Sequence, residues 1–172
     1  MSYIRYVIGI DPSGAFHEGK GTTGFAVYDR LEDKIVHITT LCASDYPSLE
    51  AYFVAHHSLI TKLRHKYINV VVSIEDFLVY GTHATTFTNS HMETCQLLGY
   101  LKTILYTESV AYYLRPAARV KKRWSNDILA HNGYVAKAGA SCFHECVVGA
   151  LATHMLDAIR HAVHCGKFEL ED

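Results

Sequence analysis

A strand that ends in a turn is predicted by the segment Tyr3-Ile-Arg-Tyr-Val-Ile-Gly-Ile-Asp11-Pro-Ser-Gly14. β-Branched and aromatic residues dominate Tyr3 to Ile10, and such side chains fit a pleated, half-buried surface. The four residues from Asp11 to Gly14 favour a turn by their residue chemistry. Asp11 is therefore expected at the carboxyl end of the first strand.

Two further strands are predicted after this turn. A polar loop with several glycines covers Gly14 to Gly21, and strand-like runs then cover Thr22 to Tyr28 and Lys34 to Leu41. The connections between these runs are too short for the crossover that parallel neighbours need. The three segments are therefore expected to form an antiparallel meander.

Helices and strands alternate in the rest of the chain. The spacing of apolar residues predicts helix Pro47–Tyr67 with Ser44 or Asp45 as its cap, buried strand Asn69–Ile74, helix Ser90–Tyr106, strand Val110–Leu114, short helix Ser125–Ala130 and helix Ser141–Cys165. Gly99 inside a helix costs roughly 1 kcal/mol against alanine, so we expect a close packing contact there. We predict one α/β domain over residues 1–172, with a mixed five-stranded sheet (a three-strand antiparallel meander plus two parallel strands) flanked by helices.

The composition is that of an ordinary globular protein. Hydrophobic residues make up 49% of the 172 residues and charged residues 19%, which excludes a mainly disordered chain. The formal net charge is -1, so any contact with nucleic acid requires a local basic patch. We expect no secretory leader and no membrane helix, because no apolar stretch is long enough. The five cysteines are loosely spaced, which favours a reducing cytoplasm (the host cytoplasm for a viral protein) over a disulfide framework.

Three acidic residues are candidates for one shared site. Asp11 and Glu75 each come at the carboxyl end of a predicted strand, and ligands of open sheets gather outside such ends. Asp157 lies in an apolar helical stretch, and His154 is three residues earlier on the same helix face. Crowded carboxylates repel one another unless a cation is present, and Mg²⁺ prefers carboxylate and water oxygens. The pattern is typical of a metal site for phosphoryl transfer.

Each of these residues also has a structural explanation. Asp11 could only form the turn, and Glu75 could only cap a loop. His154 alone is more often a surface or core histidine. A salt bridge from Asp157 to Arg160 would account for a carboxylate in an apolar helix, where an unpaired one is costly. The combination of the four residues favours the functional interpretation.

Basic residues are concentrated in one short segment. Five of the sixteen Lys and Arg fall within nine positions, namely Arg115, Arg119, Lys121, Lys122 and Arg123. Such a run is usually a solvated face, and it is also typical of a phosphate-binding patch. Lys20, in the loop after Asp11, is a further candidate phosphate contact.

Other motifs point to different chemistry and are less consistent with their surroundings. Gly14 to Lys20 has the glycine and lysine spacing of a nucleotide-binding loop, but Gly21 replaces the hydroxyl residue and a strand follows instead of a helix. Cys142, Cys146, His161 and Cys165 have metal-ligand spacings, but Cys146 and His161 would lie about 22 Å apart along one helix. No glycine-flanked serine elbow supports a Ser-His-Asp hydrolase.

The ordered set of motifs resembles one known family over nearly the whole chain. It consists of Ile8-Gly-Ile-Asp11-Pro-Ser, Thr23-Gly24-Phe-Ala-Val, Ser73-Ile-Glu75, Gln96-Leu-Leu-Gly-Tyr-Leu, Tyr113-Leu-Arg-Pro-Ala-Ala-Arg-Val-Lys-Lys and His154-Met-Leu-Asp157-Ala. Together these resemble the RuvC-type Holliday junction resolvases of the RNase H-like (retroviral integrase) superfamily, in a phage-encoded branch. The loop from Gly14 to Lys20 and the insert at 126–141 depart from the family pattern.

This resemblance implies a specific activity. It implies an RNase H-like fold and a homodimer that nicks opposite strands of a four-way DNA junction. Asp11, Glu75, His154 and Asp157 would be the catalytic and metal-binding residues, holding two Mg²⁺ ions that Mn²⁺ can replace. Phe77 and Tyr80 are the candidates for the aromatic residue that opens the junction in the bacterial proteins.

Three alternatives stay open at this point. A related nuclease would prefer flaps, replication forks or RNA–DNA hybrids. A non-catalytic protein on the same scaffold would bind DNA structures, although carboxylates repel phosphates and serve no purpose there without a metal. A purely structural domain would carry the acidic residues incidentally, and Asp11→Asn would then change no activity.

Overall fold

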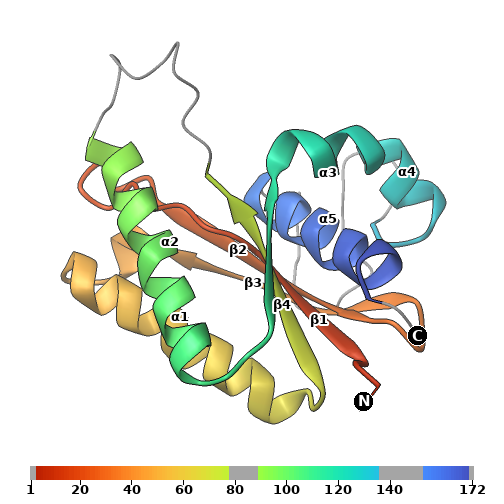
Figure 1. Cartoon of the computed structure of the whole chain (residues 1–172). Helices are drawn as coiled ribbons and strands as arrows, with labels where there is room; N and C mark the ends of the chain where they lie inside the picture. The colour runs from red at the N-terminus through yellow and green to blue at the C-terminus, as the bar shows by residue number, and fades with distance from the viewer. Residues whose placement is uncertain (1–2, 78–88, 136–152, 171–172) are drawn as a thin grey trace.

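The computed structural model describes residues 3–77, 89–135 and 153–170 and contains a five-stranded sheet (Figure 1). Its strands are β1 (Tyr6–Asp11), β2 (Thr22–Asp29), β3 (Lys34–Cys42), β4 (Val70–Asp76) and β5 (Tyr112–Pro116). The sheet order is β3-β2-β1-β4-β5. β1 pairs antiparallel with β2 and parallel with β4, which confirms the mixed sheet expected from the sequence. β3 and β5 complete it as antiparallel and parallel edge strands.

Two helices cover one face of the sheet. These are α1 (Leu49–Lys66) and α2 (Asn89–Thr107). Their core is built from large side chains, including Phe25, Tyr52, Leu97 and Leu101, all fully buried. Because these side chains are bulky, they hold the helices at a distance from the strands.

The other face is covered by α3 (Ala117–Arg123), α4 (Asn126–His131) and α5 (Thr153–Phe168). α5 lies directly on the central strands, because Gly9 and Gly24 have no side chain beneath it. A Cβ at Gly9 would collide with the carbonyl oxygen of Ala158, and one at Gly24 with that of His154. Two glycines in the strands therefore set the height of α5 above the sheet.

Several sequence expectations need correction. The cap of α1 is Ser48, whose hydroxyl accepts from the amide of Ala51 at 3.2 Å, and not Ser44 or Asp45, which belong to a preceding 3₁₀ turn. The basic segment forms a helix, α3, that the sequence reading left unassigned. Gly99 is exposed, and a Cβ there would meet nothing within 4 Å, so the expected packing contact is absent among the described residues.

The remaining boundaries agree to within a few residues. β1 and β5 begin two or three residues later than expected, and Ser125 caps α4 as predicted. α5 continues to Phe168, while the predicted helical residues 141–152 lie outside the described residues. None of the helices in the described ranges combines the length and apolar character of a membrane span.

Candidate functional site

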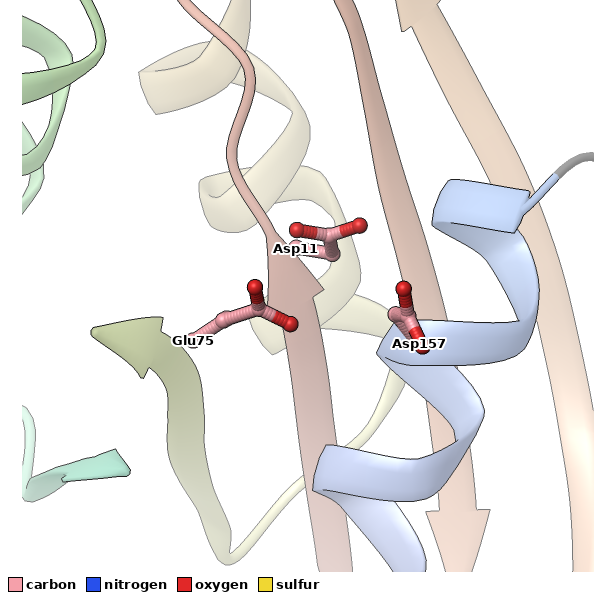
Figure 2. Close-up of side chains that lie close together, drawn as sticks. All are labelled: Asp11, Glu75 and Asp157. Atoms are coloured by element: carbon pink, nitrogen blue, oxygen red, sulfur yellow. The ribbon is translucent and has the colours of Figure 1, made fainter. Parts of the chain in front are cut away.

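The carboxylates of Asp11, Glu75 and Asp157 meet at one edge of the sheet (Figure 2). Each offers an oxygen that lies within 4.8 Å of the others. Asp11 and Asp157 are buried, at 5% and 2% exposure, and the Glu75 side chain is 20% exposed. The cluster is therefore largely withdrawn from solvent and opens mainly at Glu75.

The fold explains why these three residues meet. Asp11 is the last residue of β1, and β4 runs parallel beside it with Ile10 paired to Ile74. Glu75 therefore emerges one position further along the neighbouring strand, at the same edge. Asp11 pairs with Gly24 on its other side, and the absent side chain there admits the turn of α5 that carries Asp157. The three carboxylates come from two strands and one helix, in the arrangement that the sequence predicted.

Each carboxylate of the cluster has a basic partner. His154 Nδ1 lies 2.7 Å from Asp11 Oδ2, and His161 Nε2 lies 3.2 Å from Glu75 Oε2. Asp157 accepts from Arg160 and also pairs with Lys121, whose Nζ is 2.8 Å away. The salt bridge to Arg160 that would explain Asp157 structurally is thus present, and Asp157 still belongs to the acidic cluster.

Burial and neighbouring charges shift the pKa values of this site. Burial raises the pKa of Asp11, and the hydrogen bond with His154 opposes that rise. The same hydrogen bond raises the pKa of His154 against the effect of its burial. Burial disfavours the charge on Lys121, but the bond to Asp157 and the charges of Glu75 and Asp11 outweigh it and raise its pKa. Lys121 is thus a cation held at the acidic cluster.

The donor set of the cluster suits a hard divalent cation. All three residues offer oxygen ligands, which Mg²⁺ and Mn²⁺ prefer. Three carboxylates within 4.8 Å repel one another, and a divalent ion would offset that repulsion. Asp11, Glu75 and Asp157 therefore fit a metal, whereas His154 contacts Asp11 and lies beside the cluster.

The predicted basic residues divide between two places. Lys121 reaches the acidic cluster. Arg119, Lys122 and Arg123 face a separate hollow between α3 and the end of α5. Arg115 pairs with Glu169 instead of facing the cluster. The five residues were predicted as one patch, and the turn of α3 separates them.

Two of the other predicted DNA contacts lie against other parts of the chain. Lys20 is exposed and lies 3.7 Å from Glu18. Phe77 is half-buried and packs against the core beneath α1 and α2. Tyr80 lies outside the described residues.

The loop from Gly14 to Gly21 is not a phosphate-binding loop. The backbone amides of Phe16 and His17 donate to the buried carboxylate of Glu93, at 2.6 and 3.3 Å. That carboxylate occupies the amides which a phosphate would require. The strand β2 follows the loop, as the sequence indicated.

The residues of the considered zinc site do not gather in the described structure. His161 lies against Glu75, and Cys165 is fully buried, with burial raising the pKa of its thiol to about 12. Cys142 and Cys146 lie outside the described residues.

His161 is the residue of this site that sequence reasoning missed. In the sequence it was a candidate only for a zinc site, together with Cys165. Its spacing carried a usable signal, because His154, Asp157 and His161 follow one another at intervals of three and four and so share one helix face.

The comparison with solved structures bears on the fold. No protein-family model matches the chain, and no curated protein sequence matches it. Two solved structures align along nearly all of it, each covering 94% of this chain and 93% of its own at 16% identity. They are Thermus thermophilus RuvC in complex with a Holliday junction substrate, with a TM-score of 0.67, and Thermus thermophilus RuvC, with 0.61.

A third structure, the large terminase nuclease of the thermophilic phage G20c, aligns with a TM-score of 0.48 at 12% identity over 92% of this chain and 80% of its own. The sheet order, the helices on both faces and the full-length alignment to RuvC lead to one conclusion. This chain has the RNase H-like fold of RuvC.

Proposed function

We propose that this protein is a metal-dependent DNA endonuclease that cuts branched DNA, with four-way junctions as its preferred substrate. The observation that carries the proposal is the buried cluster of Asp11, Glu75 and Asp157 at the carboxyl ends of two parallel strands. A pure DNA-binding protein has no use for three carboxylates that repel phosphates. The RuvC fold around the cluster supports the same activity.

Asp11, Glu75 and Asp157 would hold the divalent ions, Mg²⁺ or Mn²⁺. Such ions, when bound, lower the pKa of an attacking water and stabilise the charge on the reacting phosphate. Lys121, with 45% of its side chain exposed, places a positive charge where that phosphate would approach. His154 and His161 hold the carboxylates of Asp11 and Glu75 in fixed orientations, and outer partners of this kind tune a site.

The substrate is inferred from the fold and the charges. One of the matching RuvC structures contains a Holliday junction. In a chain with a net charge of -1, α3 carries Lys121 at the acidic cluster and three further cations on another face, which together provide the local basic surface that DNA requires.

We propose that the protein acts as a homodimer, because paired nicks in opposite strands require two centres. A candidate face lies on α2, where Met92, Gly99 and Tyr106 recur at intervals of seven on the exposed side. Met92 is 52% and Tyr106 is 81% exposed, and Gly99 leaves room for a second helix. The molar mass in solution, by light scattering of the wild type and of Tyr106→Lys, tests this face. A wild type that is monomeric at all concentrations contradicts it.

A cleavage assay on a labelled immobile four-way junction tests the function. We expect paired nicks in opposite strands with Mg²⁺, none in EDTA, and none with Asp157→Asn or Glu75→Gln. Asp76→Asn is the matched control, since Asp76 follows Glu75 in β4 and successive strand side chains point to opposite faces. It should cut normally.

Duplex, flap and fork substrates separate the alternatives. Equal cutting of flaps or forks would keep the metal-dependent nuclease and remove the junction preference. Tight binding without cutting under any divalent metal would contradict the enzyme and leave a DNA-binding scaffold.

A further inference from the structure

The hollow between α3 and the end of α5 lies on the side of α3 that faces away from the acidic cluster. It has a volume of about 440 Å³, within the range of small-ligand sites. Its lining residues come from α3, from the C-terminal end of α5 and from the residue after it, namely Arg119, Lys122, Arg123, His164, Phe168 and Glu169.

The lining carries an excess of positive charge. Arg119, Lys122 and Arg123 occupy positions i, i+3 and i+4 of α3 and so share one face, while Lys121 points toward Asp157. All three are exposed, and none forms an ion pair with a carboxylate in the described part of the chain. The one lining carboxylate, Glu169, is already paired with Arg115. The hollow is therefore suited to an anion.

Two buried polar atoms in the lining lack partners among the described residues. They are Nδ1 of His164, whose residue is 6% exposed, and Oε2 of Glu169. Leaving a buried polar atom without a hydrogen bond is unfavourable, so this wall of the hollow is polar and incompletely paired.

The wall of the hollow also contains a stacked platform. The Arg123 guanidinium lies 3.7 Å from the centroid of the Phe168 ring, and Phe168 is 48% exposed. The imidazole of His164 is tilted against the same ring, at 5.5 Å between centroids. Aromatic rings and arginine planes are the surfaces on which unpaired bases stack.

A second hollow of similar size shows that volume alone does not provide these features. It has about 480 Å³ and lies on α1, lined by His57, Ser58, Thr61, Lys62 and His65. Its rings are the imidazoles of His57 and His65, and it has neither an arginine–phenylalanine pair nor a buried polar atom without a partner in the described structure.

We propose that the hollow at α3 and α5 binds one unpaired nucleotide of a DNA strand, outside the acidic cluster. Arg119 and Lys122 take the phosphate, and the Arg123–Phe168 platform takes the base. Phosphate and a flat ring are together the chemistry of a nucleotide. The inference rests on the proposed action on DNA and adds a second contact to it.

The position of the hollow sets its distance from the cut. His164 and Phe168 are seven and eleven residues after Asp157, so they lie about 10 and 16 Å further along α5. At roughly 3.4 Å per nucleotide, this corresponds to about three to five nucleotides from the cleaved phosphate. A strand that leaves the acidic cluster along α3 would thus enter the hollow.

Binding of a fluorescein-labelled single-stranded 15-nucleotide DNA, measured by anisotropy in EDTA, tests the proposal without any cleavage. We expect Phe168→Leu to weaken binding roughly fivefold or more, since a stacking ring is lost. We expect Arg119→Gln with Lys122→Gln to weaken it and to lower the slope of log affinity against log salt concentration by about 1.4 for two lost phosphate contacts. Lys62→Gln with Lys102→Gln removes the same charge from the opposite face and is the control.

Unchanged affinity in both variants, or an equal loss in the control, would overturn the proposal. If Phe168→Leu weakened the binding of free dAMP but left the affinity for the oligonucleotide unchanged, a DNA strand would not be the occupant of the hollow. The result is independent of the junction assay. Intact cleavage with normal single-strand binding by the variants would reject the hollow alone, whereas the expected binding losses without any cleavage would reject the nuclease alone.

Discussion

The two faces of the sheet are packed in opposite ways. Beneath α5, the strands present Gly9 and Gly24, so the helix backbone lies on the sheet and carries charged side chains into it. Beneath α1 and α2, rings and long aliphatic chains separate the helices from the strands. One face brings a helix backbone close to the strands, and the other buries a large volume of side chains between helices and strands.

Buried polar groups differ between the two faces as well. Under α1, His56, Thr23 and Tyr52 form a neutral, closed network, with His56 Nε2 2.8 Å from Thr23 Oγ1 and Tyr52 donating to the carbonyl of Ser13 at 2.9 Å. Under α5, the buried groups are carboxylates with cationic partners. The neutral network fixes the loop after Asp11 together with the Glu93 carboxylate of α2, which accepts from the amides of Phe16 and His17. The carboxylates under α5 instead lie within 4.8 Å of one another, an arrangement that suits a cation.

The largest expected contrast is between activity and stability in Glu75→Gln. Cleavage should be abolished, while the free energy of unfolding in EDTA should stay the same or rise, because one repelling charge is removed. Wild-type protein should gain about 2.7 kcal/mol from Mg²⁺ at a hundred times its Kd, and the variant should gain much less. Urea unfolding with and without Mg²⁺ measures both. Equal stabilisation of the two proteins would remove the metal from this cluster.

Gly9→Ala should break the proximity of α5 to the sheet. Its Cβ would meet the carbonyl of Ala158 and the side chain of Ala162, and we expect a loss of about 3 kcal/mol or more together with cleavage. The same change at the exposed Gly99 should stabilise the protein by about 0.5–1 kcal/mol. Thermal unfolding of both variants checks the pair, and equal effects would contradict the contrast between the faces.

Acid should lower the free energy of unfolding through His56, which is buried under α1. Burial lowers the pKa of His56 to about 4, below its ordinary value near 6.5. Between these values the unfolded chain binds a proton that the folded chain does not, so this stabilisation is complete above pH 6.5 and is lost as the pH falls toward 4. The loss amounts to about 3 kcal/mol. His56→Gln should show a flatter pH dependence of unfolding, and an unchanged one would contradict the assignment.

The smallest expected effect concerns the cation beside the cluster. Lys121→Met should slow single-turnover cleavage by roughly tenfold to a hundredfold, as for other partners of a metal site. Lys102→Met, on the opposite face, is the control and should cut at the wild-type rate. A wild-type rate for Lys121→Met would leave that lysine with a structural role only.

The central features could be predicted because they depend on local patterns. β-Branched runs gave the strands, and their ends gave Asp11 and Glu75. Asp157 was predictable because a charge in an apolar helix stretch requires an explanation. Short-range spacing and burial thus account for the sheet and for the three carboxylates.

The rest depended on tertiary contacts. The different roles of Lys121 and of Arg119 and Arg123 could not be predicted, because α3 was not predicted as a helix and its turn places these side chains on different faces. The packing of Phe77 into the core and the pairing of Arg115 with Glu169 both involve partners distant in sequence. Gly99 was misjudged because helix propensity does not report what lies above a helix.

The origin of Asp157 in α5 also has a consequence for synthesis. Asp11 and Asp157 are 146 positions apart, and the acidic cluster is incomplete until α5 settles on Gly9 and Gly24. Chains are made at about 5–20 residues per second and fold from the N-terminus onward. A growing chain on the ribosome therefore lacks the complete acidic cluster until residue 157 has emerged and docked. Under the proposed function, the order of translation delays a reactive centre until the surrounding fold is in place.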